Sequence, residues 1–139
     1  MKFLLLILWI TWGSLGYGST SPGEQRLKVL VPELIEQGHS QAYFASIYLV
    51  VTEGLRKKLN GREFQHTSCM NLLLDEFLVM YFEALYNPRK APRAWSEAFE
   101  TETKPSIHLL LGLNAHISHD LPLSMWRVSQ KHPECSPRR

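Results

Sequence analysis

The segment Thr67–Tyr86, TSCMNLLLDEFLVMYFEALY, constrains the fold more than any other part of the sequence. Its apolar residues lie nearly all around the circumference of a helix instead of on one stripe. A helix of this kind has to be covered on every side, so we expect it to be the central and most buried element. Asp75 lies in its middle and therefore needs a polar partner within the fold.

A second helix is predicted over residues 41–59, ahead of Asn60 and Gly61, which form a good helix stop. Its apolar residues recur at i, i+4 spacing, and we expect its basic residues, Arg56, Lys57 and Lys58, to face away from the core. The apolar stripe consists of Phe44, Ile47, Tyr48, Val51, Leu55 and Leu59.

Three further segments have helical spacing. Residues 27–35 have this spacing, although Pro32 lies among them. The proline predicts either a break in the helix or a position in its first turn. A short helix after Pro92 would present Trp95 and Phe99. A last helix begins near Pro105 and is expected to end near Leu121, because Pro122 follows. With no convincing pair of strands, the sequence predicts an all-α fold, a single domain of four to five packed helices.

The N-terminus, MKFLLLILWITWGSLGYGS, has the layout of a secretory signal peptide over residues 1–18, with cleavage after Gly16 or Gly18. Its apolar run is too short to span a membrane comfortably, and no later segment could do so. We therefore expect a secreted, extracellular protein with no stable membrane span after cleavage. A linker over 19–26, a helical domain over 27–124 and a polar tail over 125–139 would follow.

Two further features bear on partners and compartment. The formal net charge of +2 gives no strong field for a polyanion, so nucleic acid is not an expected partner. Cys69 and Cys135 are the only cysteines, and a secretory route would allow them to form a disulfide. A free or intermolecular thiol at Cys135 is the alternative that the sequence leaves open.

The candidate site lies in HLLLGLNAHISHDLPLS, residues 108–124. On a regular helix, His108, His116, His119 and Asp120 share one arc, with Gly112 between them. The opposite arc is apolar apart from Asn114, and contains Ile107, Leu110, Leu113, Ile117 and Leu121.

His116 and Asp120 are four residues apart, so both side chains can reach one point. They are either an ordinary surface ion pair, two ligands of a metal such as zinc, or an acid–base pair without a metal. His108 is a weaker metal-ligand candidate. Asn114 on an apolar face needs a hydrogen bond, and Asp75 is a candidate partner, which would make Asn114 structural.

These residues resemble the signature G-x-N-A-H-I-x-x-D-L-P of the domain of unknown function 5995 family. The matching residues are Gly112, Asn114, Ala115, His116, Ile117, Asp120, Leu121 and Pro122. The segment YLVVTEGL, residues 48–55, resembles another part of that family, and the resemblance covers about 44–124. It implies a helical fold and favours His116 and Asp120 over His119, without implying a reaction.

Family members continue beyond the signature, so this chain resembles a C-terminally truncated form. We therefore expect apolar surface on the last helix to be left uncovered, with self-association as a consequence. Two hypotheses for function remain. In the first, Asn114, His116 and Asp120 form a structural polar cluster or a partial site in a secreted helical protein of unknown molecular function. In the second, the protein is a zinc-dependent hydrolase resembling the phospholipase C and P1 nuclease group.

Overall fold

The computed structural model describes residues 20–100 and 104–136, so the predicted signal peptide lies outside the described residues. The predicted all-α fold is confirmed, with no strand among the described residues. The helices are α1 (Pro22–Glu36), α2 (Ala42–Asn60), α3 (Thr67–Tyr86), α4 (Arg93–Glu100), α5 (Pro105–Ala115) and α6 (Leu121–Lys131). A π-helical turn, η2 (His116–Asp120), joins α5 to α6, and short 3-10 turns lie at η1 (Pro88–Lys90) and η3 (Pro133–Cys135).

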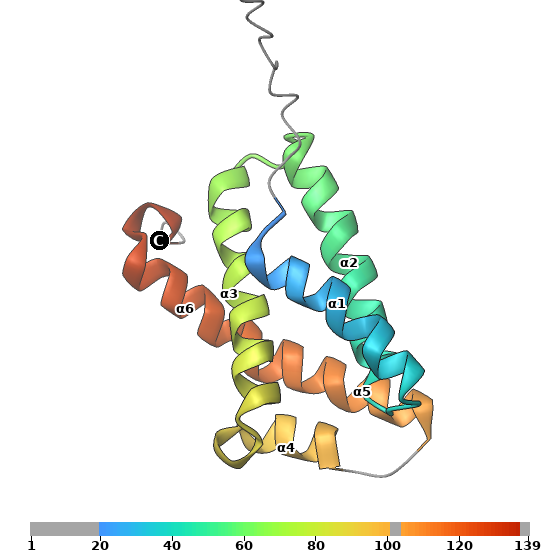
Figure 1. The fold of residues 1–139 in the computed structure, drawn as a ribbon. Coiled ribbons are helices and arrows are strands. Elements are labelled where there is room, and N and C mark those ends of the chain that lie inside the picture. The colour runs from blue at the N-terminus through green and yellow to red at the C-terminus, as the bar shows by residue number, and fades with distance from the viewer. Residues whose placement is uncertain (1–19, 101–103, 137–139) are drawn as a thin grey trace, which may run out of the picture.

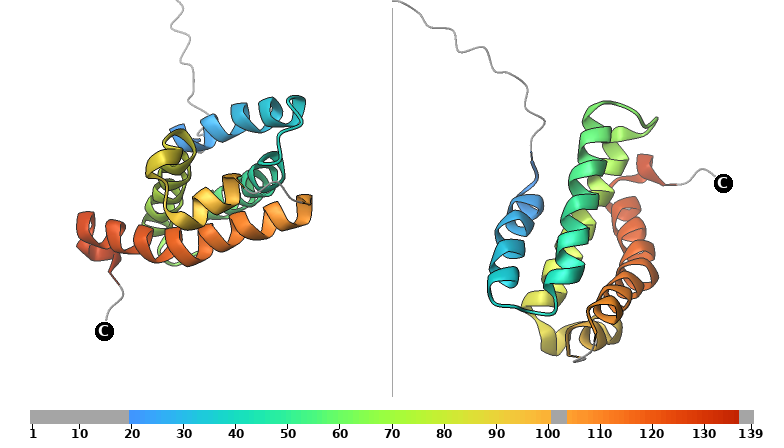
Figure 2. Two further views of the ribbon diagram at one scale, coloured as in Figure 1. Left: turned by 90° about the horizontal axis from the view of Figure 1, so that it is seen from below. Right: turned by 90° about the vertical axis from the view of Figure 1, so that its right-hand side faces the viewer.

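The helices are arranged around the pair formed by α2 and α3 (Figure 1). Figure 2 shows α1 on one side of this pair, and α5 with α6 on the other. Helix α4 contacts α3 and α5 at one end of the molecule. Through η2, α5 and α6 form one nearly continuous rod, in which α5 contacts α2 and α6 contacts α3.

Helix α3 is the central element, as its sequence predicts. It contacts α1, α2, α4, α6 and η2, and Leu78 and Tyr81 on it are fully buried. The main core cluster draws on five helices; its largest buried members are Leu27, Leu34, Phe44, Tyr48, Leu78, Tyr81, Phe82 and Trp95. Burial of these aromatic side chains supplies much of the driving force for folding.

Helix α1 begins earlier than the sequence predicts and does not break at Pro32. Ser21 caps it by accepting a hydrogen bond from the Glu24 backbone N–H at 3.3 Å, and Pro22 occupies the first turn. Pro32 lies inside the helix on its exposed side. The backbone carbonyl that loses its partner there can be hydrated, because Lys28, four residues earlier, is also exposed.

The expectation that Arg56 faces away from the core is wrong. Its guanidinium is buried and contacts Glu24 of α1 and both Asn71 and Asp75 of α3. Asp75 thus finds its partner in Arg56 and not in Asn114. Glu24 is also buried, so the ion pairs of Arg56 join three helices, α1, α2 and α3. Removing Arg56 would leave the buried Glu24 carboxylate without this partner.

Helix α6 occupies much of the segment expected to be a polar tail. Ser124 and Val128 are buried against the rest of the fold, and Arg127 reaches Glu76 and Glu83 of α3. A disulfide joins Cys69, near the start of α3, to Cys135 in η3. The chain after Ser124 is therefore tied to the central helix by ion pairs and by a covalent bond.

A membrane-spanning element was not expected after the N-terminus. Within residues 20–100 and 104–136, no helix combines the length and the apolar character that crossing a bilayer requires.

Two glycine substitutions, one at the contact between α5 and α2 and one away from it, should change the free energy of unfolding in opposite directions. A Cβ on Gly112 would lie 2.5 Å from Cδ2 of the buried Phe44, whereas a Cβ on Gly54 of α2 would meet nothing within 4 Å. Gly112→Ala should therefore lower the free energy of unfolding, because overpacking costs about 1–3 kcal/mol. Gly54→Ala should raise it by about 0.5–1 kcal/mol through helix propensity. Urea unfolding of both variants checks this, and a stabilised Gly112→Ala protein would contradict the close packing.

Candidate functional site

The candidate residues lie on the rod formed by α5, η2 and α6, and the polar arc of this rod faces the core. His108 is 3% exposed and Asp120 is 1% exposed, whereas Leu110 is 63% and Ile117 is 59% exposed. An ordinary surface ion pair between His116 and Asp120 is thereby excluded. Leu110 and Ile117, together with Ile107, form an exposed outer face, whereas Leu113 and Leu121 of the same apolar arc are half-buried. Self-association through the outer face stays a prediction.

The π-helical turn η2 explains why the chain continues past Pro122. The backbone N–H of Leu121 donates to the carbonyl of His116, five residues earlier, which widens the helix by one residue. Pro122 has no N–H, and it occupies the first turn of α6, where none is needed. The expected helix end near Leu121 is therefore wrong, because the wide turn accommodates the proline.

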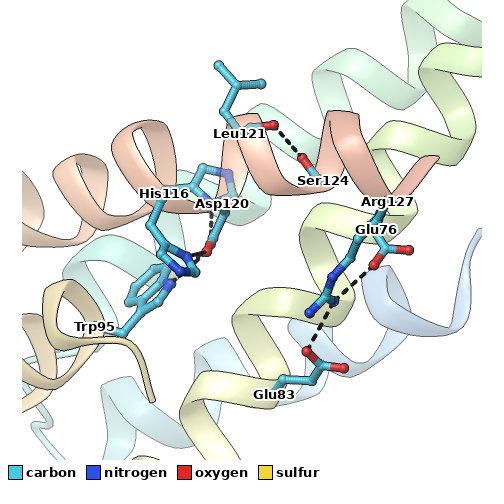
Figure 3. A network of polar contacts seen from close by, with 9 residues as sticks. Glu76, Glu83, Trp95, His116, Asp120, Leu121, Ser124 and Arg127 are labelled. Atoms are coloured by element: carbon cyan, nitrogen blue, oxygen red, sulfur yellow. Dashed lines mark hydrogen bonds and ion pairs between the residues drawn. The ribbon is translucent and has the colours of Figure 1, made fainter. Parts of the chain in front are cut away.

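The Asp120 cluster, formed by Asp120, Trp95, His116 and His119, is the main polar group of the site. Figure 3 shows Trp95, His116 and Asp120 of this cluster. The indole Nε1 of Trp95 lies 3.0 Å from both carboxylate oxygens. Nδ1 of His119 lies 2.9 Å from Oδ1, and Nδ1 of His116 lies 3.3 Å from Oδ2. Three N–H groups from α4 and η2 thus compensate a carboxylate that has almost no contact with water.

This arrangement sets the orientation of His116. An ionised carboxylate only accepts hydrogen bonds, so Nδ1 of His116 has to carry the proton that it shares with Asp120. The Nε2 atom is then the ring nitrogen left to contact another molecule. The His116 ring lies among aromatic side chains, with its centroid 4.5 Å from that of Tyr48 and 4.3 Å from that of Phe77.

Asn114 and His108 lie apart from these contacts. Asn114 is exposed and accepts a hydrogen bond from the Ser118 hydroxyl at 3.1 Å, so the expectation of a buried amide paired with Asp75 is wrong. His108 is buried two turns before His116, where it lines a small cavity with Phe44 and Gly112. Phe44 packs directly against Gly112.

An apolar cleft of about 290 Å³ lies between α2, α3 and the α5–η2–α6 rod. His116 forms part of its wall, and no Lys, Arg, Asp or Glu residue lines it. Ile47 and Val51, expected to belong to the buried stripe of α2, are 45% and 58% exposed and form its rim. The remaining lining residues are Phe44, Tyr48, Thr52, Leu55, Met70, Leu73, Leu74, Phe77, Leu113 and Leu121.

No metal centre accompanies this cleft in the described part of the chain, where no three His, Cys, Asp or Glu side chains are placed to hold a metal ion. Nδ1 of His116 and Nδ1 of His119 are both directed to Asp120, so neither of these nitrogens offers a free lone pair to a metal. This finding does not favour the zinc-dependent hydrolase.

Sequence reasoning missed three members of this region: Trp95, His119 and Tyr48. Trp95 was expected on a short helix, and a buried indole N–H needs an acceptor, so a carboxylate elsewhere in the chain was a foreseeable partner. The resembled signature has a variable position at His119, and so favours His116 and Asp120 over it. Tyr48 belongs to the predicted apolar stripe of α2, and nothing in the sequence indicates that its ring contacts His116.

Comparison with known proteins adds a family. The sequence profile of a family described as "Family of unknown function (DUF5995)" matches residues 24–139. The chain belongs to this family. The match confirms the resemblance seen in the sequence and extends it to α1 and α6, beyond the 44–124 that the motifs cover. No curated protein and no solved structure matches the chain. The description of this family names no activity.

The Asp120 cluster makes a prediction about stability. Asp120→Asn keeps the shape of the side chain but turns one acceptor into a donor that faces the N–H groups of Trp95 and the histidines. It should lower the free energy of unfolding by about 1–3 kcal/mol. Glu63→Gln, which weakens the exposed ion pair with Lys58, is the matched control and should change stability by less than about 1 kcal/mol. Equal effects in chemical denaturation would show that the buried cluster carries no special stability.

Proposed function

We propose that the protein is a secreted helical binding protein whose cleft between α2, α3 and α5 takes a small apolar molecule. The observation that carries the proposal is the cleft of about 290 Å³, whose wall is almost entirely apolar and has Tyr48, Thr52 and His116 among its lining residues. Ligand sites commonly have this composition, a mainly apolar wall with few polar groups that fix orientation.

Two properties of the cleft support binding over simple core packing. Its rim residues, Ile47 and Val51, are half exposed, so a molecule from solution can reach it. Its floor is formed by partly buried α3 residues such as Leu73 and Phe77, which already lack full contact with other side chains. A bound apolar molecule would remove both groups from water, which is favourable by about 25 cal/mol per Å² of apolar surface.

In this proposal the Asp120 cluster is a structural network that serves the binding site. The carboxylate ties α4 to η2 through Trp95 and fixes the ring of His116 through Nδ1. His116 is then the group by which the network contacts a ligand. A fixed imidazole loses less freedom on binding than a mobile one, so the network favours affinity as well as stability.

Secretion is the second part of the proposal. Its support is the basic, apolar and small-residue order of the N-terminus, together with the Cys69–Cys135 disulfide, because disulfides persist in oxidising compartments.

Secretion predicts a defined mature N-terminus. When the full chain is expressed in a cell with a secretory pathway, the medium should contain protein that begins at Tyr17 or Ser19. N-terminal sequencing of the purified product measures this. Recovery of protein with an intact Met1 from the membrane fraction would contradict it.

Binding is tested by two tryptophan substitutions on neighbouring residues of α2. Val51 lies on the rim of the cleft, whereas Val50 is 66% exposed and does not line it. Val51→Trp should block the entrance and weaken binding of an uncharged fluorescent dye such as N-phenyl-1-naphthylamine at least tenfold. Val50→Trp, which adds the same side chain outside the cleft, should leave dye affinity unchanged. Equal affinities for both variants and the unmodified protein, by fluorescence titration, would contradict the proposed site.

A further inference from the structure

A second cavity, of about 670 Å³, lies beside the disulfide, between the start of α3 and the segment formed by α6 and η3. Met70 and Leu73 of α3 line both this disulfide-side cavity and the apolar cleft. On the rod, Leu121 lines the cleft, and Met125, about one turn later, lines the cavity. Because one wall is shared and the other continues on the next turn, the cleft and the cavity are successive parts of one groove between α3 and the rod.

The rod sets the length of this groove. Its lining residues extend from Leu113 in the cleft to Val128 in the disulfide-side cavity. At about 1.5 Å per helical residue, this interval spans about 20 Å. An extended chain of single bonds advances about 1.2 Å per bond, as an extended polypeptide does. The groove is therefore about as long as a hydrocarbon chain of about sixteen carbons.

The two parts of the groove differ in polarity. The wall of the cleft is almost entirely apolar, whereas His66, Glu134 and Ser136 line the disulfide-side cavity. All three of these residues are exposed, so a polar group beside them keeps its contact with water. No Lys or Arg residue lines either part of the groove. An anionic group at this end would therefore meet Glu134 without a lysine or arginine to compensate it.

We propose that the groove binds one long-chain amphiphile with an uncharged head. The hydrocarbon chain lies in the cleft and continues into the disulfide-side cavity, and the hydrated head lies near Glu134. A peptide suits the cleft less well, because its backbone N–H and C=O groups would lose water without gaining partners on an apolar wall. This inference rests on the proposed function, since it names the class of molecule that the cleft binds.

Chain length is the first test. Displacement of the fluorescent dye from the purified protein gives the affinities of octan-1-ol, decan-1-ol, dodecan-1-ol and tetradecan-1-ol. Affinity should rise about two- to fourfold per added methylene through the whole series, because the added carbons enter the disulfide-side cavity. A plateau after the shortest alcohols would overturn the inference, while the apolar cleft and the proposed function would stand. If none of the alcohols displaces the dye, both fail.

A tryptophan at Met125 separates the two parts of the groove. Met125 is 45% exposed and lines the disulfide-side cavity but not the cleft. Met125→Trp should therefore lower the affinity for tetradecan-1-ol at least tenfold and leave that for octan-1-ol unchanged, which also shows that the variant is folded. Gln130→Trp, at an exposed position of α6 that lines neither part, is the matched control and should change neither affinity. Absence of a selective loss for tetradecan-1-ol in Met125→Trp would overturn the inference.

A change of charge at Glu134 tests where the head lies. Glu134→Lys places a cation beside the proposed head position, so the affinity for dodecanoate relative to dodecan-1-ol should rise about fivefold at low ionic strength. Glu36→Lys makes the same change of net charge at an exposed position of α1 outside the groove, and should leave this ratio unchanged. An unchanged ratio in Glu134→Lys, or an equal rise in both variants, would overturn the proposed position of the head.

Discussion

The burial of the Asp120 carboxylate is the constraint on which the arrangement of the other groups depends. A carboxylate that is 1% exposed has to be hydrogen-bonded on all sides, and here the donors are Trp95 of α4 and two histidines of η2. The short helix α4 has to lie against the rod for Trp95 to reach it. The rod in turn has to present its polar arc to the core, which leaves Leu110 and Ile117 outside.

The same constraint connects packing to function. Nδ1 of His116 donates a hydrogen bond to Asp120, and this contact fixes the orientation of the imidazole ring. The ring lies at the wall of an apolar cleft. Tyr48 and Thr52 of α2 line the same cleft.

Hydrophobic periodicity predicted the central part of the fold well. The all-round apolar character of residues 67–86 predicts α3 and its central place, and the stripe of residues 41–59 predicts α2 within one residue at each end. Hydrophobic periodicity did not predict which face of α5 is buried. A helix with one polar and one apolar arc can bury either arc if its polar groups find partners. The partners of Asp120 come from α4 and from a π-helical turn, and neither the long-range contact with Trp95 nor the extra residue in η2 is visible in a regular helical projection. Arg56 was misplaced for the same reason, since its compensating charges lie on two other helices.

We infer that Asp120 holds His116 in the tautomer with a protonated Nδ1 and an unprotonated Nε2. Nitrogen-15 NMR of histidine-labelled protein, at a pH where the His116 ring is neutral, measures this directly because protonated and unprotonated ring nitrogens have well-separated shifts. We expect a protonated Nδ1 and an unprotonated Nε2 in the unmodified protein, and loss of this preference in Asp120→Ala. A His116 ring with its proton on Nε2 in the unmodified protein would contradict it.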